Sequence, residues 1–216
     1  MSKSNPFLIF LSLLTALSLL LNIKLLSDRR VLQPTYKVLE VIDGDTFKIN
    51  NNRRVRLMGV NTPETGKCLA SQAKEKLAGL VLGKDVTLSD QFSDPYGRII
   101  ANVFNDGKYI NYEMLTSGLA RMDYYENPHR DELKKAYEQA REKKLGIFGN
   151  LCISAIPPDS CGIKGNIDDN TQKKFYYLPN CNNYSQVIID LSTEDQWYCS
   201  EAEAIKAGFT KSKTCN

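Results

Sequence analysis

The chain has 216 residues, of which 42% are hydrophobic and 25% are charged. This composition is typical of a globular protein with a hydrophobic core, and it excludes an intrinsically disordered chain. The formal net charge of +3 is compatible with a polyanionic partner but does not single one out, because both signs of charge are mixed along the chain.

An apolar segment lies close to the N-terminus. Residues 7–21 carry no formal charge, Lys3 precedes them, and the run has the length of the apolar region of a secretory signal. A membrane span needs about 20 residues, which this run reaches only by including Asn22 and Lys24. No clear cleavage site follows. We expect residues 1–30 to be an uncleaved signal anchor in the membrane or, alternatively, a cleaved signal peptide, rather than a core helix. The remaining chain would then be membrane-anchored outside the cytoplasm, or secreted.

Short β-branched runs separated by turn signals follow this segment. Asp43-Gly44 and three consecutive asparagines separate the first three runs, which is typical of β-hairpins. In the third run Val55 and Leu57 share one face and Arg56 points to the other, because side chains alternate along a strand. The expected strands are residues 36–42, 46–50, 53–59, 84–90 and 98–106.

Three further segments have apolar residues at helical spacing. The second has Asn111 as a candidate N-cap, and glycines are placed to end all three. The expected helices are residues 70–82, 110–118 and 127–146. Three strands, a helix, two strands and two helices, in that order, predict an α+β fold built on a small closed barrel.

The chain changes character after Gly149. Residues 151–172 are rich in proline, glycine and polar residues and are expected to be a linker, which leaves 36–150 as the main domain. Residues 173–216 are expected to form a small α/β satellite module that ends in a short helix. A module of this size is not stable on apolar burial alone, so its cysteines matter.

Charged residues and oxygen donors are concentrated at turns and strand ends in three segments, 43–46, 56–64 and 94–98. Carboxylate, amide and carbonyl oxygens are the ligands that a hard cation such as Ca²⁺ prefers. Arginines can bind phosphate oxygens in pairs, and a glutamate can hold and deprotonate a water molecule. Together these groups can attack a phosphodiester and stabilise the charge that develops. Because His129 is the single histidine, paired-histidine ribonucleases and His-rich zinc hydrolases are excluded.

These segments resemble the staphylococcal nuclease (thermonuclease) family. Five motifs occur in the family's order and approximate spacing over residues 36–149: IDGDT, RLMGVNTPET, DPYGR, GLARM and KKLGIFG. The resemblance implies a five-stranded OB-fold β-barrel with three helices. It also implies a calcium-dependent nuclease that hydrolyses the phosphodiester bonds of DNA and RNA with little sequence preference and leaves 3′-phosphates.

The resemblance also assigns roles by position. Asp45 and the backbone carbonyl of Thr62 would bind calcium, and Glu64 would act as the general base or orient the attacking water. Two arginines would bind the phosphate and stabilise the transition state, and two tyrosines would contact the nucleotide. These are Arg56 and Arg98 for the phosphate, and Tyr96 and Tyr124 for the nucleotide.

Two residues depart from the family's pattern. Asn61 lies where the family's best-known member has a calcium-binding aspartate. An amide oxygen can still bind Ca²⁺ but carries no charge, so we expect weaker metal binding rather than loss of the site. Pro95 replaces a lysine beside the nucleotide, which removes one phosphate contact.

Each of these residues also has a purely structural interpretation. Asp43 is expected to be a turn residue rather than a direct metal ligand. Asp45 alone could be a hairpin acid, Arg56 could pair with Glu64, and Tyr96 could pack within its turn. The lysines of the last helix are most simply its solvent-exposed face.

Six cysteines without a C-x-x-C pair suit a compartment in which thiols oxidise. Exported relatives carry a cysteine in the loop after TPET together with one past the final motif, so the resemblance implies a Cys68–Cys152 disulfide. The other four form two further disulfides in our preferred interpretation, or a four-cysteine zinc site. They are Cys161, Cys181, Cys199 and Cys215.

Three functions remain in view at this point. The first is the membrane-tethered or secreted calcium-dependent nuclease, expected to be monomeric. The second is a catalytically inactive nucleic-acid-binding OB-fold module that has lost its catalytic groups. The third, an extracellular structural or adhesive protein that uses the C-terminal module, gains little from the sequence. The enzyme is favoured because four groups are present together: Asp45, Arg56, Glu64 and Arg98.

Overall fold

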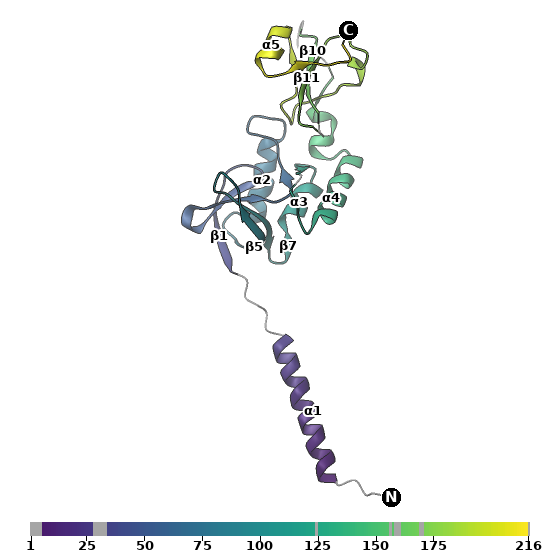
Figure 1. Cartoon of the computed structure of the whole chain (residues 1–216). Helices are drawn as coiled ribbons and strands as arrows, with labels where there is room; N and C mark the ends of the chain where they lie inside the picture. Colours follow the sequence, from purple (N-terminus) through teal and green to yellow (C-terminus); the bar gives the residue numbers. More distant parts are fainter. Residues whose placement is uncertain are drawn as a thin grey trace, which may run out of the picture. The chain divides into compact units, whose positions relative to one another are not determined.

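The computed structural model describes residues 6–27, 34–123, 125–155, 157, 161–168 and 171–215. The chain forms two compact units, Met1–Pro34 and Thr35–Asn216, which are described separately (Figure 1). The first unit contains α1 (Pro6–Ser27), a helix of 22 residues. Within the described part of the chain, neither α1 nor any other helix is long and apolar enough to cross a membrane.

Five strands of the second unit close into a barrel. The parallel pairing of the first and last strands joins the two edges of the sheet, with Val55 opposite Ile99. Closure leaves no open sheet edge within the barrel. In sheet order the strands are β3 (Arg54–Leu57), β2 (Thr46–Ile49), β1 (Thr35–Val41), β5 (Asp85–Ser93) and β6 (Ile99–Asn105). The five-stranded barrel predicted from the sequence is confirmed, with small shifts at the strand ends.

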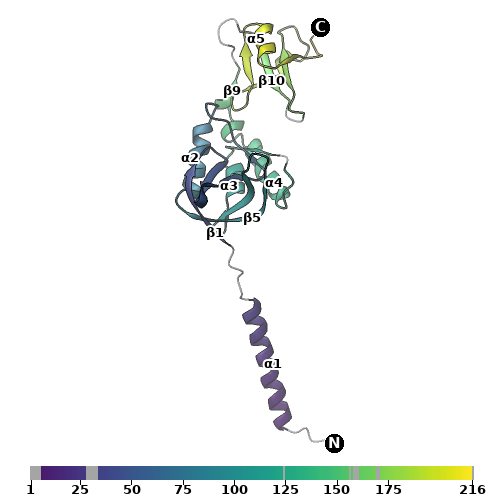
Figure 2. The ribbon, with the colours of Figure 1, turned by 60° about the vertical axis from the view of Figure 1, so that its left-hand side comes forward.

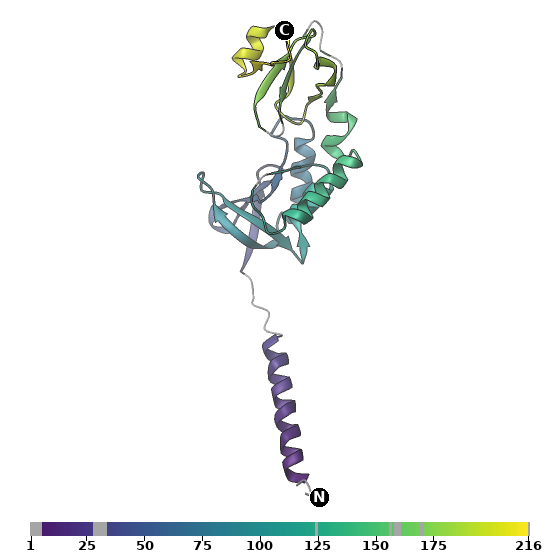
Figure 3. The ribbon, with the colours of Figure 1, turned by 45° about the vertical axis from the view of Figure 1, so that its right-hand side comes forward.

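Three helices lie against the barrel, as Figures 2 and 3 show from two directions. They contribute their apolar faces, including Leu77, Met114 and Leu133, to the same core as the strands. They are α2 (Ala70–Val81), α3 (Ile110–Thr116) and α4 (Arg130–Glu142). Short 3-10 helices are found at Asn50–Asn52, Gly146–Phe148, Asn150–Cys152 and Tyr184–Gln186. The predicted number and order of helices in this domain are confirmed.

Asn111 is not the N-cap of α3, so that prediction was wrong. The residue lies inside the helix and is fully buried. Its amide oxygen accepts a hydrogen bond from the Val103 N–H at 3.0 Å, and its Nδ2 donates to the carbonyl oxygens of Met58 (2.8 Å) and Ala101 (3.2 Å). Asn111 thus fastens α3 to β6 and to the turn after β3.

Three pairs of short strands complete the connections. The two-residue strand β7 (Lys108–Tyr109) extends β6 as a hairpin. Strand β4 (Val60–Asn61) pairs with β8 (Arg121–Met122), and β9 (Ile153–Ser154) pairs with β12 (Ile189–Asp190). The β9–β12 pair joins the chain just after the barrel domain to a segment of the C-terminal module.

The C-terminal module is a four-stranded sheet with one helix, α5 (Glu201–Lys206). The strand order is β13 (Gln196–Tyr198), β10 (Ile163–Ile167), β11 (Lys174–Tyr177) and β14 (Thr210–Lys211). Tyr198 and Phe209 pack over Gly165, where an added Cβ would lie 2.5 Å from the Tyr198 ring. Strands β9 and β10 fall within residues 151–172, so the structure differs from the expectation that this range is only a linker.

All six cysteines form disulfides. Cys68 and Cys152 are joined across 84 residues, with their Cα atoms 5.6 Å apart, as the resemblance implied. Two further disulfides, Cys161–Cys199 and Cys181–Cys215, lie within the C-terminal module. No free thiol remains, which excludes the alternative four-cysteine zinc site.

Candidate active site

The site begins at the tight turn between β1 and β2. The Asp43 carboxylate accepts hydrogen bonds from the N–H groups of Asp45 (3.0 Å) and Thr46 (2.8 Å), which makes Asp43 the turn residue that the sequence predicted. Burial and the charge of Asp45 raise the pKa of Asp43. Gly44 packs so closely that an added Cβ would lie 2.6 Å from Thr62 Oγ1 and 2.7 Å from the Ala73 Cβ. This turn therefore sits directly against the segment after β4 and against α2.

Asp45 is the most buried carboxylate of the site, with 3% of its surface exposed. One oxygen, Oδ2, accepts hydrogen bonds from the N–H (3.0 Å) and the hydroxyl (3.1 Å) of Thr62. The other, Oδ1, accepts from the Thr46 hydroxyl at 2.9 Å and from Arg56 Nη1. Asp45 thereby connects the first hairpin, β3 and the segment that follows β4.

Arg56 projects from the barrel on the face opposite its apolar neighbours, as predicted. Val55 and Leu57 are fully buried, whereas the Arg56 side chain is 13% exposed. Its guanidinium donates to Asp45 through Nη1 and to the Asn61 amide oxygen at 2.8 Å through Nη2. The carboxylate paired with Arg56 is therefore Asp45, not the Glu64 of the structural interpretation.

The donors predicted to bind calcium come together at this guanidinium. Asp45 and Asn61 each direct a side-chain oxygen at it, and Thr62, the residue after Asn61, donates its N–H and its hydroxyl to Asp45. These donors fit Ca²⁺ in kind, because all are oxygens, but only one carries a charge. No cluster of three or more His, Cys, Asp or Glu side chains suited to a metal occurs among the described residues. Calcium binding at this place would therefore depend on the neutral oxygens of Asn61 and Thr62.

Arg98 follows a turn organised by Asp94. The Asp94 carboxylate accepts from the N–H groups of Tyr96 (2.9 Å) and Arg98 (2.8 Å), and from Arg98 Nε at 2.7 Å. Burial raises the pKa of Asp94, but the hydrogen bonds and charge of Arg98 outweigh it and lower the pKa overall. Burial lowers the pKa of Arg98, yet Asp94 and then Asp45 raise it overall, so Arg98 lies within electrostatic reach of Asp45.

The residues predicted to contact substrate are more open to solvent. Tyr96 is 84% exposed, and the Arg98 guanidinium lies 5.5 Å from the centre of its ring. Tyr96 is therefore largely open to solvent, and its contact with Arg98 lies within its own turn. Glu64 is exposed and borders a cleft of about 430 Å³ together with Asn61 and Thr62. Tyr124 lies outside the described residues.

Residues 54–150 match the family model described as staphylococcal nuclease homologue. The chain is 30% identical over 127 residues to a micrococcal nuclease of Shigella flexneri, an alignment that covers 53% of this chain and 73% of the relative. The chain belongs to the staphylococcal nuclease family. An uncharacterized endonuclease of Haemophilus influenzae is 31% identical over 142 residues, which cover 64% of this chain and 78% of the relative. A thermonuclease of Staphylococcus hyicus is 30% identical over 131 residues, 55% of this chain and 78% of the relative.

These relatives support a nuclease function in general for this member of the staphylococcal nuclease family. Several of them are named nuclease or endonuclease, and the matched range includes Arg56, Glu64 and Arg98. The family model ends at residue 150, so the C-terminal module lies beyond it.

The C-terminal module borders the same cleft as the segment Val60–Cys68, which carries Asn61, Thr62 and Glu64 and is called the active-site segment below. The sequence did not indicate this contact between the module and the cleft. Ser192, Thr193 and Glu194 line the cleft together with Glu64. Arg121, from the GLARM motif of this staphylococcal nuclease homologue, donates to the Ser192 hydroxyl at 2.9 Å and to Asp190. The GLARM motif contains Arg121, but no pattern near Arg121 in the sequence predicts a hydrogen bond to a residue 69 positions away.

Proposed function

We propose that this chain is a calcium-dependent nuclease that hydrolyses phosphodiester bonds of DNA and RNA with little sequence preference, leaving 3′-phosphates. The observation that carries the proposal is the convergence of Asp45, Asn61 and Arg56 at one place, with Glu64 on the adjoining cleft. Arg98 lies directly before β6, the strand that pairs with β3. Burial lowers the pKa of Arg98, but Asp94 and then Asp45 raise it overall. Membership of the family supports the reaction class.

Each residue has a distinct part in the proposed reaction. Asp45, Asn61 and the Thr62 carbonyl would hold calcium, which when bound polarises the phosphate and offsets its charge. Glu64 takes the proton from a water molecule that attacks the phosphorus. Arg56 and Arg98 donate hydrogen bonds to the phosphate oxygens, where negative charge increases in the transition state. Tyr96 and Tyr124 contact the neighbouring sugar or base.

One observation favours the second candidate, nucleic-acid binding without cleavage. Asp45 already accepts four hydrogen bonds, two of them from Thr62, one from Thr46 and one from Arg56. Arg56 must therefore exchange Asp45 for phosphate before the carboxylate is available to a cation. If that exchange does not occur, the arginines still bind the nucleic-acid backbone but no hydrolysis follows.

We also propose that the catalytic domain acts outside the cytoplasm as a monomer, membrane-anchored or secreted. Support comes from the three disulfides, because thiols oxidise and stay paired in exported proteins.

The decisive experiment is digestion of DNA and RNA by the purified chain, with Ca²⁺ and with EGTA. We expect cleavage only with Ca²⁺, and a fall of about 10²–10⁴-fold in kcat for Glu64→Gln, because the group that accepts the proton is lost. Glu75→Gln is the matched control, since Glu75 is an exposed glutamate on α2. Binding of DNA without cleavage at any Ca²⁺ concentration would favour the second candidate. Cleavage that persists in EGTA would rule out calcium dependence.

A further inference from the structure

The active-site segment is fastened on one side by the β4–β8 pair. Asn61 and Arg121 lie directly opposite one another in this pair, and Val60 lies opposite Met122. The Asp123 N–H continues the ladder by donating to the Gly59 carbonyl at 3.1 Å. The backbone of Asn61 therefore follows any displacement of Arg121.

The side chain of Arg121 binds the C-terminal module. Nη1 donates to the Ser192 hydroxyl at 2.9 Å and Nη2 donates to the Asp190 carboxylate. Only 19% of the Arg121 side chain and 26% of the Asp190 side chain are exposed. A planar guanidinium that contacts two acceptors of one turn fixes orientation as well as distance.

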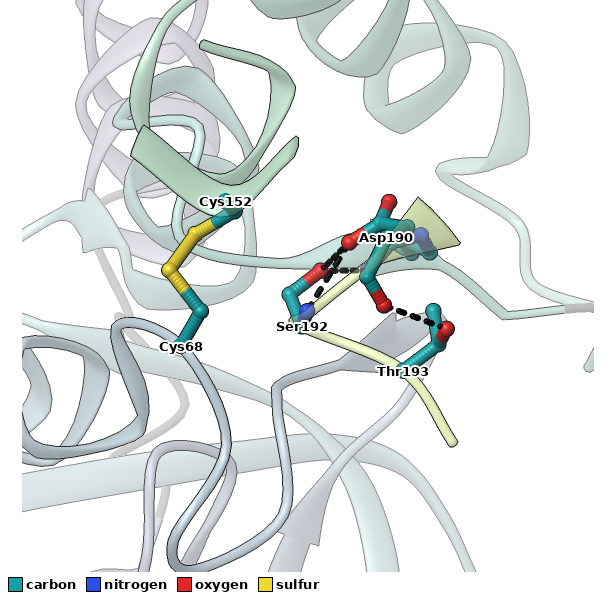
Figure 4. The surroundings of a disulfide bond; sticks show 6 residues. Cys68, Cys152, Asp190, Ser192 and Thr193 are labelled. Atoms are coloured by element: carbon teal, nitrogen blue, oxygen red, sulfur yellow. Dashed lines mark hydrogen bonds and ion pairs between the residues drawn. A yellow bond between two sulfur atoms is a disulfide. The ribbon is translucent and has the colours of Figure 1, made fainter. Parts of the chain in front are cut away.

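The turn that receives Arg121 is itself held in shape. The Asp190 carboxylate accepts from the Ser192 N–H at 2.9 Å and from its hydroxyl, and the Thr193 hydroxyl donates to the Asp190 carbonyl at 2.9 Å (Figure 4). The Asp190 N–H donates to buried Asp195, whose other oxygen accepts from the Ile167 N–H of β10 at 2.9 Å. The turn is thus tied to the central sheet of the module.

The far end of the active-site segment meets the same turn. The Leu191 carbonyl accepts from the Cys68 N–H at 3.0 Å, and the Leu191 N–H donates to the Cys152 carbonyl at 2.7 Å. One residue of the module therefore bonds to both halves of the Cys68–Cys152 disulfide, beside which the turn lies in Figure 4. The segment from Val60 to Cys68 is held at both ends by Asp190–Ser192.

We propose that Arg121 is a positioning residue, through which the Asp190–Ser192 turn of the C-terminal module holds Asn61, Thr62 and Glu64 in their working arrangement. The catalytic consequence rests on the proposed function, whereas the positioning itself does not. Groups that orient metal ligands typically contribute about 10–100-fold to metal affinity or activity. The C-terminal module then stabilises the geometry of the active site and is not an independent binding unit.

The test compares Arg121→Ala, Arg121→Lys and Asp190→Asn with the wild-type full chain, and uses Lys206→Gln as the matched control. Lys206 is an exposed lysine of α5 in the same module and does not line the cleft. Hydrogen exchange is measured without metal, Ca²⁺ binding by calorimetry, and kcat and KM on DNA.

Both Arg121→Ala and Asp190→Asn should speed amide exchange in residues 59–68 while the barrel strands keep wild-type protection. Ca²⁺ affinity and kcat should each fall about tenfold with KM for DNA nearly unchanged. Arg121→Lys should recover part of the loss, because lysine keeps the charge but not the two-acceptor geometry. Lys206→Gln should match the wild type in all of these measurements.

Two results would overturn the positioning role. One is wild-type exchange in residues 59–68 of Asp190→Asn. The other is faster exchange spread evenly over the whole domain, which indicates a general loss of stability. An inactive wild type would refute the proposed function instead, and the exchange measurement would still decide the positioning role.

Discussion

Replacing Gly44 by alanine tests whether the turn between β1 and β2 sets the geometry of the site. The new Cβ would meet Thr62 Oγ1 at 2.6 Å, the Ala73 Cβ at 2.7 Å and the Thr62 Cβ at 2.8 Å. Neither neighbour can yield easily, because Thr62 is hydrogen-bonded to Asp45 and Ala73 is buried in α2. Overpacking of this kind costs about 1–3 kcal/mol of folding free energy.

Gly44→Ala should also lower the rate of the proposed reaction. Movement of Thr62 away from Asp45 lengthens the two hydrogen bonds between these predicted calcium ligands. A misplacement of about 1 Å in an active site can lower the rate about 100-fold. Denaturant unfolding and kcat on DNA, measured on the same preparation, separate the two effects.

Gly79→Ala is the internal control. Gly79 lies on the exposed side of α2, and nothing lies within 4 Å of the position of a Cβ. Alanine there should stabilise the protein by about 0.5–1 kcal/mol with no change in rate, because glycine is unfavourable inside a helix. If Gly44→Ala unfolds at the wild-type denaturant concentration, the steric reasoning is wrong. If it is destabilised but fully active, the turn does not control the site.

Three further outcomes are expected. Removing the Cys68–Cys152 disulfide with a double alanine substitution should lower the free energy of unfolding by about 4.5 kcal/mol in the loop-entropy model, measured by denaturant titration; a loss below 1 kcal/mol would contradict that model here. Asn61→Asp should reduce the Ca²⁺ concentration for half-maximal binding about tenfold or more, since it adds a charge beside the cation; unchanged calorimetric affinity would remove Asn61 from the ligand set. The pKa of Asp43 is raised in the folded protein above its ordinary value of 3.8. Ionisation of Asp43 therefore lowers the free energy of unfolding as the pH rises from 3.8 through the raised pKa. Asp43→Asn keeps the acceptor oxygen and should be more stable than the wild type at pH 7, with the advantage shrinking as the pH falls toward 3.8, measured as the free energy of unfolding against pH.

The barrel was predictable because its signals are local. Alternation around Val55 and Leu57 identified the buried face of β3, and Asp-Gly turns marked the hairpin ends. The motif segments place Asp45 directly before β2, Arg56 within β3 and Arg98 directly before β6, and β3 pairs with both other strands.

The missed features depend on contacts that no short stretch of sequence encodes. Strand β10 contains Gly165 among polar residues, which weakens the strand pattern, and Gly165 is needed only because Tyr198 packs over it from another strand. Asn111 precedes apolar helical residues as an N-cap would, but its partners are backbone groups of β6 and the turn after β3. The bond from Arg121 to Asp190 likewise joins two different modules.

The parallel pairing of β3 with β6 also determines when an active site first exists. Arg56 and Arg98 belong to segments far apart in the chain, and this pairing brings their strands together. Pairings between distant segments form late, because the entropy of closing the intervening loop opposes them. A chain still being synthesised therefore carries Asp45, Arg56, Glu64 and Arg98 before they form one site. Under the proposed function, the nucleic acids of the producing cell are exposed to an inactive polypeptide until the barrel closes.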